Sequence, residues 1–196
     1  MAGVKDIKMK PKLLSAFLIA GLIPLTIIAM LSLDKAKDGM MKQAFNQLAA
    51  VQKIKETQVG TFFGERVGDV QVLADNPYTK MAVVELQKAS ADARARGLGG
   101  PSLQQDAAYK GVYDTYHPTF KYYMETYGYY DVFLISPTDG DVFYTVCQEA
   151  DYGTILSRES THLSKTWKRA LSSGQPTLSD MEPYAPSNGA PAMFVA

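Results

Sequence analysis

Apolar residues fill one long run near the start of the chain. From Leu13 to Leu33, twenty-one residues carry no charge. A helix of this length covers about 30 Å, the thickness of the hydrocarbon core of a bilayer. The run therefore predicts one membrane-spanning helix, kinked at Pro24, which removes a backbone hydrogen bond. A cleaved signal peptide is the alternative, but its apolar region usually covers about 7–15 residues, so the longer run favours an uncleaved anchor.

A helical repeat of apolar positions follows, from roughly residue 36 to Ala74. It comprises Met41, Ala44, Leu48, Val51, Ile54, Phe62, Val67, Val70 and Leu73. This pattern predicts one long amphipathic stalk helix, ended by Asn76 and Pro77. Its length indicates pairing with a partner helix, and we expect a homodimer. Gly60, Gly64 and Gly68 lie on one face, which fits either a close helix contact or local softening of the helix.

Two helices joined by a connection are expected next. Tyr78 to Leu86 predicts a short helix, and residues 90–106, rich in Gly and small polar residues, predict an exposed connection. Six rings then recur at spacings of four and three, which places them on one stripe of a helix that Gly128 ends: Tyr109, Tyr113, Tyr116, Phe120, Tyr123 and Tyr127. We interpret the stripe mainly as core, with only the last rings as candidate ligand walls.

A β-hairpin is the strongest short-range signal in the chain. Residues 129–136 and 141–147 alternate as strands around the turn pair Asp139–Gly140. Simple pairing puts Asp131, Phe133, Ile135, Val142, Tyr144 and Val146 on one face, and Tyr130, Val132, Leu134, Phe143, Thr145 and Cys147 on the other. Both faces are largely apolar, so we expect helices on one and a small ligand on the other.

The last part of the chain predicts a loop at 149–160, a helix from Thr161 to Ser172 that Gly174 ends, and a strand within 176–184. A turn at 185–191 precedes a strand that restarts at Ala192. A strand interrupted in this way would leave an open sheet edge, so we expect the chain to be the amino-terminal part of a longer protein.

Charge orients the chain in the membrane. Four lysines against Asp6 give residues 1–12 a net charge of +3, while the other flank of the span is neutral. The positive side is expected in the cytoplasm, so the residues after the span face outward. Twenty basic and twenty acidic residues balance overall, which disfavours nucleic-acid binding. Cys147 is the single cysteine, so no internal disulfide can form.

Candidate chemistry is sparse. His117 stands without a cluster of further ligands, so no metal site and no cofactor are predicted. Asp139 with Asp141, and Ser160 with His162, are the pairs that most resemble catalytic sets. The aspartates belong to a turn, and Ser160 lacks a nucleophile elbow and a third partner, so we expect no enzyme. A passive coiled-coil anchor is a further alternative, against which the hairpin and the polar turn argue.

The segments YGYYDVFLISPTDGDVFYTV (127–146) and EPYAPSNGAPA (182–192), in this order after an anchor and a long helix, resemble a known family. They are similar to the outward-facing, PAS-like Cache sensor domains of bacterial methyl-accepting chemotaxis proteins. The resemblance covers most of residues 34–196 and implies a transmembrane chemoreceptor that signals to a cytoplasmic chemotaxis kinase and adaptor through a missing carboxyl-terminal part. The alternative output is a histidine kinase or nucleotide cyclase, because one sensor can join different machinery. The arginine and tryptophan–tyrosine cluster with which some double-Cache receptors hold amino acids has no clear match.

The expected fold class is α+β, a transmembrane helix continuing into a stalk and then an antiparallel sheet flanked by helices. The expected segments are a cytoplasmic tail at 1–12, the span at 13–33, the stalk at 34–76 and the sensor at 77–196. The pocket is predicted from apolar walls at Phe133 and Tyr144, lids at Tyr127 and Trp167, and polar contacts at Asp180, Tyr184, Ser187 and Asn188. Core packing and turn capping are the alternative roles of these residues.

Overall fold

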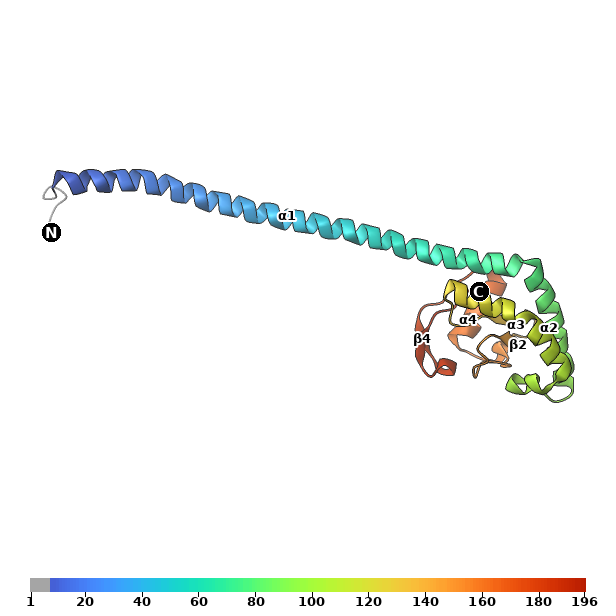
Figure 1. Cartoon of the computed structure of the whole chain (residues 1–196). Helices are drawn as coiled ribbons and strands as arrows, with labels where there is room; N and C mark the ends of the chain where they lie inside the picture. Colours follow the sequence, from blue (N-terminus) through green and yellow to red (C-terminus); the bar gives the residue numbers. More distant parts are fainter. Residues whose placement is uncertain (1–7) are drawn as a thin grey trace. The chain divides into compact units, whose positions relative to one another are not determined.

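The computed structural model describes residues 8–196, which form a mostly helical α+β fold (Figure 1). Its α-helices are α1 (Met9–Asp75), α2 (Pro77–Ala95), α3 (Ala107–Tyr127) and α4 (His162–Ser173), and its strands form two small antiparallel sheets. The chain divides into two compact units, Met1–Gly60 and Thr61–Ala196. Of the predicted tail at 1–12, residues 1–7, with Lys5 and Asp6 among them, lie outside the described residues.

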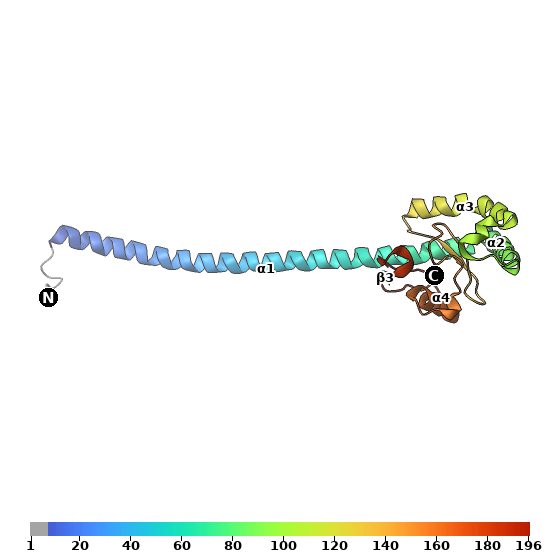
Figure 2. The same ribbon diagram turned by 90° about the horizontal axis from the view of Figure 1, so that it is seen from below.

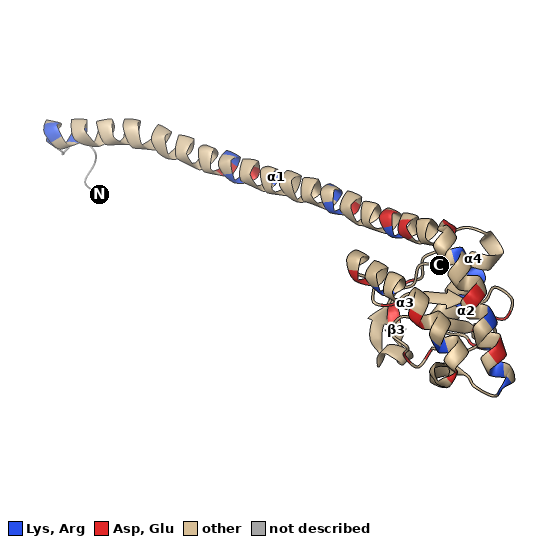
Figure 3. Cartoon of the chain, turned by 45° about the vertical axis from the view of Figure 1, so that its right-hand side comes forward, with Lys and Arg blue, Asp and Glu red and all other residues tan. Residues whose placement is uncertain are grey.

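Helix α1 accounts for the described part of the first unit up to Gly60, and no residue of the helix is buried. Figure 3 shows its uncharged stretch in tan, followed by mixed blue and red positions. The helix is long and apolar enough to cross a membrane, by length and composition, although a signal sequence would meet the same criterion. Pro24 lies inside α1, and near it the Thr26 hydroxyl donates to the carbonyl of Ile23 at 3.0 Å. Such a bond offers one local way to satisfy carbonyls in a proline-interrupted helix.

The second unit begins with the last turns of α1, which ends at Asp75 as predicted. Asn76 starts the next helix rather than only ending this one, because its side chain accepts a 2.8 Å hydrogen bond from the Tyr78 amide. Pro77 occupies the first helical position, where its missing N–H costs nothing.

Helix α2 is longer than predicted, and the expected loop at 90–106 is largely wrong. Residues up to Ala95 are helical, and Ser90 and Ala93 are completely buried. Alanine has the highest helix propensity, and small side chains allow close packing, so the segment extends the helix. A 3₁₀ helix, η2 (Gly100–Gln105), then leads into α3 and buries Leu103.

Helix α3 confirms the aromatic stripe. Asp106 caps its start by accepting hydrogen bonds of 3.0 Å from the amides of Ala108 and Tyr109. Gly128 ends it in the left-handed conformation, at φ 71°. The first four rings of the stripe are buried, whereas Tyr127 at the end is 46% exposed. The stripe is therefore core for most of its length.

The predicted hairpin is confirmed, and Ile135 and Val142 share a face as predicted, but the assignment of Tyr144 to the face of Phe133 is wrong. Strand β1 (Phe133–Ile135) pairs with β2 (Val142–Thr145), and the register shifts between Leu134 and Ile135. Leu134 lies opposite Tyr144, while Ile135 lies opposite Val142. Opposite residues share a face, and a bulge inserts one extra residue, so strict alternation fails at this point. Tyr144 is thus turned to the face of Leu134, away from that of Phe133.

Two apolar clusters lie on the two sides of this hairpin. The larger one joins α2 and α3 to Leu134, Phe143 and Tyr144. The smaller one joins Val142, Leu156, Leu163, Trp167 and Tyr184, with Phe133 and Ile135 packed against it. Figure 2 shows α3 and α4 on opposite sides of the second unit, in agreement with these clusters. Helices therefore cover both faces of the small sheet.

The remaining elements complete the second side. The loop after β2 contains a short 3₁₀ helix, η3 (Leu156–Arg158), and helix α4 begins after Thr161 as predicted and ends at Gly174. The strand predicted within 176–184 shortens to β3 (Glu182–Tyr184), which pairs with β4 (Ala190–Ala192) across η4 (Ala185–Ser187). Residues 177–179 also bond to 194–196, with the Ser179 amide donating to the Phe194 carbonyl at 2.8 Å.

Candidate ligand-binding site

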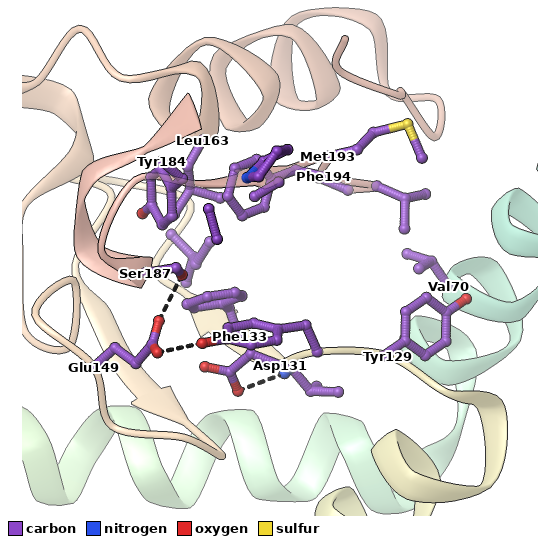
Figure 4. Close-up of a pocket in the computed structure, with 18 of the residues that line it drawn as sticks. Val70, Tyr129, Asp131, Phe133, Glu149, Leu163, Tyr184, Ser187, Met193 and Phe194 are labelled. Atoms are coloured by element: carbon purple, nitrogen blue, oxygen red, sulfur yellow. Dashed lines mark hydrogen bonds between the residues drawn. The ribbon is translucent and has the colours of Figure 1, made fainter. Parts of the chain in front are cut away.

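A cavity of about 350 Å³ lies within the second unit (Figure 4). Three segments form its wall: the last turns of α1, with Val70 and Leu73; residues 129–135, which enter and form β1; and the carboxyl-terminal segment 190–196. Tyr184 and Ser187, at the end of β3 and in η4, close one side together with Leu163 of α4. Its volume lies at the lower end of the range of small-molecule sites, which is about 300–1,000 Å³.

Aromatic rings dominate this wall. Tyr123, Tyr129, Tyr130, Phe133, Tyr184 and Phe194 all line the cavity. The rings support one another, since Tyr123 stacks on Tyr129 with centroids 5.8 Å apart and Phe194 meets Tyr184 edge-on at 5.0 Å. Such contacts hold the rings in place without filling the space between them. The cavity is therefore a preformed, mainly apolar site.

The polar part of the wall centres on Glu149. One carboxylate oxygen accepts a hydrogen bond from the Tyr130 hydroxyl at 2.5 Å, and the other accepts from the Ser187 hydroxyl at 2.7 Å. Figure 4 shows both bonds at one end of the cavity. Glu149 thus connects the segment that precedes β1 to η4, and it also lines the cavity.

Asp131 is the second acid of the wall, and its bonds are structural. One of its oxygens accepts from the amides of Val132, Val146 and Cys147, and the other accepts from the Thr145 hydroxyl at 2.6 Å. These bonds clamp the end of β2 to the start of β1. Burial raises the pKa of Asp131 despite them, since desolvation disfavours the carboxylate.

A third acid, Asp151, lies behind the wall. It is 2% exposed, one of its oxygens accepts a 3.0 Å bond from the Tyr184 hydroxyl, and the other has no partner among the described residues. Burial raises the pKa of Asp151 to about 6, with repulsion from Asp131 adding to the effect. Three acidic side chains, Asp131, Glu149 and Asp151, are therefore in or directly behind the cavity wall.

The α1 wall is attached to the rest of the unit by Arg66. Its guanidinium donates to the Tyr127 carbonyl at 2.8 Å and pairs with Asp69 at 3.4 Å. The Tyr129 hydroxyl donates to the same Asp69 at 3.1 Å, and the guanidinium lies 5.2 Å from the centre of the Tyr129 ring. One cavity ring is thus bonded directly to the helix that carries Val70 and Leu73.

Three of the eight predicted site residues line this cavity: Phe133, Tyr184 and Ser187. Tyr127 is not part of the wall but packs its ring on Tyr123, with centroids 4.6 Å apart. Tyr144 is fully buried in the α2–α3 cluster, and Trp167 is buried in the smaller cluster.

The other two predicted polar contacts lie outside the wall. Asp180 is exposed and lies in the chain just before β3. Asn188 ends η4 in the left-handed conformation, at φ 55°, which is the turn role weighed from the sequence.

Several wall residues were not expected from the sequence. The sequence pattern assigns Val70 and Leu73 to the stalk stripe, residues 190–191 to a turn and residues 192–196 to a strand. Their only sequence signal was apolarity, which core and cavity residues share. Glu149 stood in a segment predicted as loop, and no local pattern linked it to Ser187, 38 positions later.

Three of the four residues considered for catalysis, Asp139, Asp141 and His162, have structural partners. The amide of Asp141 bonds to the Asp139 carboxylate within the turn, and the Asp141 side chain forms an ion pair with Arg94. His162 contacts the Ala192 carbonyl at 3.2 Å through Nε2. Among the described residues, no group of three or more His, Cys, Asp or Glu side chains could hold a metal ion.

Comparisons with protein-family models, with curated proteins and with solved structures found no match to this chain.

Proposed function

We propose that the chain is a membrane-anchored sensor whose outward domain binds a small molecule. The observation that carries this proposal is the cavity of about 350 Å³, walled by aromatic rings and by a few polar groups at one end. Small-molecule sites have this composition, in which the apolar wall supplies affinity and the few polar groups supply orientation. The Cache-like, PAS-like class proposed from the sequence resemblance fits a helix-flanked hairpin of this kind, and no chemical step is assigned to the site.

In this proposal the binding signal passes to the membrane segment through α1, because α1 forms part of the cavity wall. Val70 and Leu73 belong to α1, the same helix that contains the apolar stretch Leu13–Leu33. A ligand that contacts these residues and Tyr129 stabilises one position of the end of α1 relative to Arg66 and Tyr127. Only a ligand with different affinities for two such positions can shift their populations, so direct contact with α1 favours this route.

The ligand-binding part is tested with the full chain in nanodiscs by a thermal-shift screen of organic acids, amino acids and amines. Val70→Trp would fill the cavity and is expected to abolish the shift caused by any hit. Val72→Trp is the matched control, because Val72 lies on the same helix and is 71% exposed. No hit at all, or equal shifts in both variants, would refute the cavity as a ligand site.

Outward topology is tested with single cysteines in a Cys147→Ser background. Tyr122 lies on α3 and is 70% exposed, so Tyr122→Cys should react with a membrane-impermeant maleimide in intact bacteria. Lys8→Cys, on the other side of the apolar stretch, should react only after lysis. The reverse pattern would contradict the proposed placement in the bacterial inner membrane, and loss of the amino-terminal segment from the mature protein would identify a signal peptide.

A homodimer through residues 36–75 is part of the proposal. Met40, Met41, Phe45, Leu48, Val51 and Ile54 are all more than half exposed on α1. A helix with so much apolar surface is stabilised mainly by packing against a partner. Leu48→Cys should therefore cross-link two copies in membranes, whereas Asn46→Cys, about 200° away around the helix, should not. Equal cross-linking at both positions would argue against the dimer.

Chemotactic output, through a cytoplasmic kinase and adaptor, rests on the sequence resemblance alone. The coding sequence that follows Ala196 distinguishes it from the alternative. A HAMP linker and a long methylated helical bundle would support chemotaxis, and a histidine kinase or nucleotide cyclase domain would support the other output.

A further inference from the structure

The ionisable side chains that line the cavity are all acidic. Asp131 and Glu149 contribute carboxylates, and among the lining residues of the described chain there is no Lys, Arg or His. Asp151, one layer behind, contacts the wall through Tyr184. Carboxylates around a cavity of low polarity give it a negative electrostatic potential, and this potential is weakly screened because little water is present. Charge therefore discriminates among ligands at this site.

Glu149 is the acid best able to meet a ligand. It is half-buried, and each of its oxygens accepts one hydrogen bond, from Tyr130 and from Ser187. A carboxylate has about four lone-pair positions, so further acceptor capacity remains. None of the cationic side chains among residues 8–196 forms an ion pair with Glu149 within 4.0 Å. Asp131, by contrast, already accepts four bonds and contributes mainly its charge.

Two basic side chains, Arg66 and His162, contact rings of the wall but do not line the cavity themselves. Arg66 lies over Tyr129 but is paired with Asp69. His162 meets the rings of Tyr184 and Phe194, with centroids 5.1 and 4.7 Å away, and its Nε2 contacts the Ala192 carbonyl. Neither group neutralises Glu149.

The rings of the wall add to the same preference. The face of an aromatic ring carries negative partial charge and attracts cations, most strongly where water is excluded. Six rings line this cavity, and three of them, Tyr129, Tyr130 and Phe133, lie in β1 or just before it. Several aromatic faces next to a carboxylate form the usual environment for a desolvated ammonium group.

We infer that the cavity binds an organic cation, an ammonium group carried on an apolar body, with Glu149 as the counter-charge and the tyrosine and phenylalanine rings as the surrounding wall. This inference rests on the ligand-binding role proposed above and specifies its ligand class. The ammonium group lies at the Glu149–Ser187 end, and the apolar body extends towards Val70 and Leu73. Occupancy then connects the acidic end of the cavity to helix α1.

The test uses three probes of one shape: benzylammonium, benzyl alcohol and benzoate. Their affinities for the full chain in nanodiscs are measured by isothermal titration calorimetry at pH 7.5. Benzylammonium is expected to bind at least about tenfold more tightly than either of the others, since one ion pair with aromatic contacts supplies a factor of this size. Glu149→Gln should reduce that preference over benzyl alcohol to less than about threefold.

Glu125→Gln is the matched control, because Glu125 is an exposed acid of α3 outside the lining residues. It should leave all three affinities unchanged. Glu149 is chosen over Asp131 because the Asp131 bonds hold the strands together, so its loss could unfold the unit. Equal binding of the three probes, or tighter benzoate, would overturn the cationic class while the cavity remained a ligand site. Absence of binding by all three would also overturn it, and the library screen with Val70→Trp then decides the proposed function separately.

Discussion

The hydroxyl of Tyr184 donates a 3.0 Å hydrogen bond to the carboxyl group of Asp151. Asp151 lies between Val142 and Leu156 of the smaller apolar cluster in sequence, and Tyr184 belongs both to that cluster and to the cavity wall. The bond therefore links the loop after β2 to β3, 33 positions later. It also leaves one buried oxygen of Asp151 without a partner among the described residues.

This buried acid makes stability depend on pH. The pKa of Asp151 is raised to about 6 by burial, compared with about 3.9 for aspartate in an unfolded chain. Between these values the folded state binds the proton more tightly, so the free energy of unfolding should fall as pH rises from about 4 to 6. Asp151→Asn should flatten this dependence.

The measurement is thermal unfolding of the full chain in nanodiscs between pH 4 and 7.5, followed through Trp167, the single tryptophan. Asp180→Asn, at an exposed position, is the control and should retain the wild-type profile. Because burial also raises the pKa of Asp131 and Asp141, part of the slope should remain in Asp151→Asn. An unaltered slope would show that Asp151 titrates as an exposed acid.

A chain of hydroxyl groups supports the α3 side of the core. The Tyr109 hydroxyl donates to the Phe143 carbonyl at 2.7 Å and accepts from the Tyr152 hydroxyl at 2.7 Å. Tyr109→Phe leaves both buried partners unsatisfied and should lower the free energy of unfolding by about 1–3 kcal/mol. Tyr122→Phe, on the exposed face of the same helix, should change it by less than about 0.5 kcal/mol. Equal effects in denaturant titrations would mean that the buried network is not formed.

Gly153 marks a close contact between two loops. Its φ is +77°, and a Cβ there would lie 2.3 Å from the backbone of Gly100. Gly153→Ala should cost about 2–5 kcal/mol, because overpacking is added to the strain of a left-handed residue. Gly128→Ala measures the backbone strain without overpacking, because Gly128 has φ +71° with open space around it. It should lower the free energy of unfolding by about 1–2 kcal/mol. Denaturant titration of both variants gives the difference, and similar losses would refute the close contact.

The Cys147 thiol should react slowly although part of the residue is exposed. Burial, reinforced by the neighbouring carboxylates of Asp131, Glu149 and Asp151, raises the pKa of Cys147 to about 11. Because the thiolate is the nucleophile, alkylation by iodoacetamide at pH 7.5 should be about 100-fold slower than for an ordinary exposed cysteine. Tyr122→Cys in a Cys147→Ser background supplies that reference. Comparable rates would show that the acidic cluster does not act on Cys147.

Local patterns were sufficient for most elements. The apolar run, the helical repeat up to Ala74, the ring stripe from Tyr109 and the helix after Thr161 are all helical in the structure. Each rests on periodicity within one segment, together with capping residues such as Asn76 and Gly128, which act on adjacent backbone groups. The Ala-rich end of α2 was missed because its glycine and serine neighbours have turn-forming character, while packing against α3 decides in favour of helix.

The sequence by itself determined where helices and the hairpin form and that a long apolar helix stands first, because these properties depend on neighbours along the chain. Tertiary structure alone decided which residues face the cavity. The bulge after Leu134 turned Tyr144 into the helical core and left Phe133 on the cavity side, and a shift of one residue exchanges the two faces of a strand. Val70, Glu149 and Phe194 meet around one space only because three distant segments fold together, a relationship that no local periodicity records.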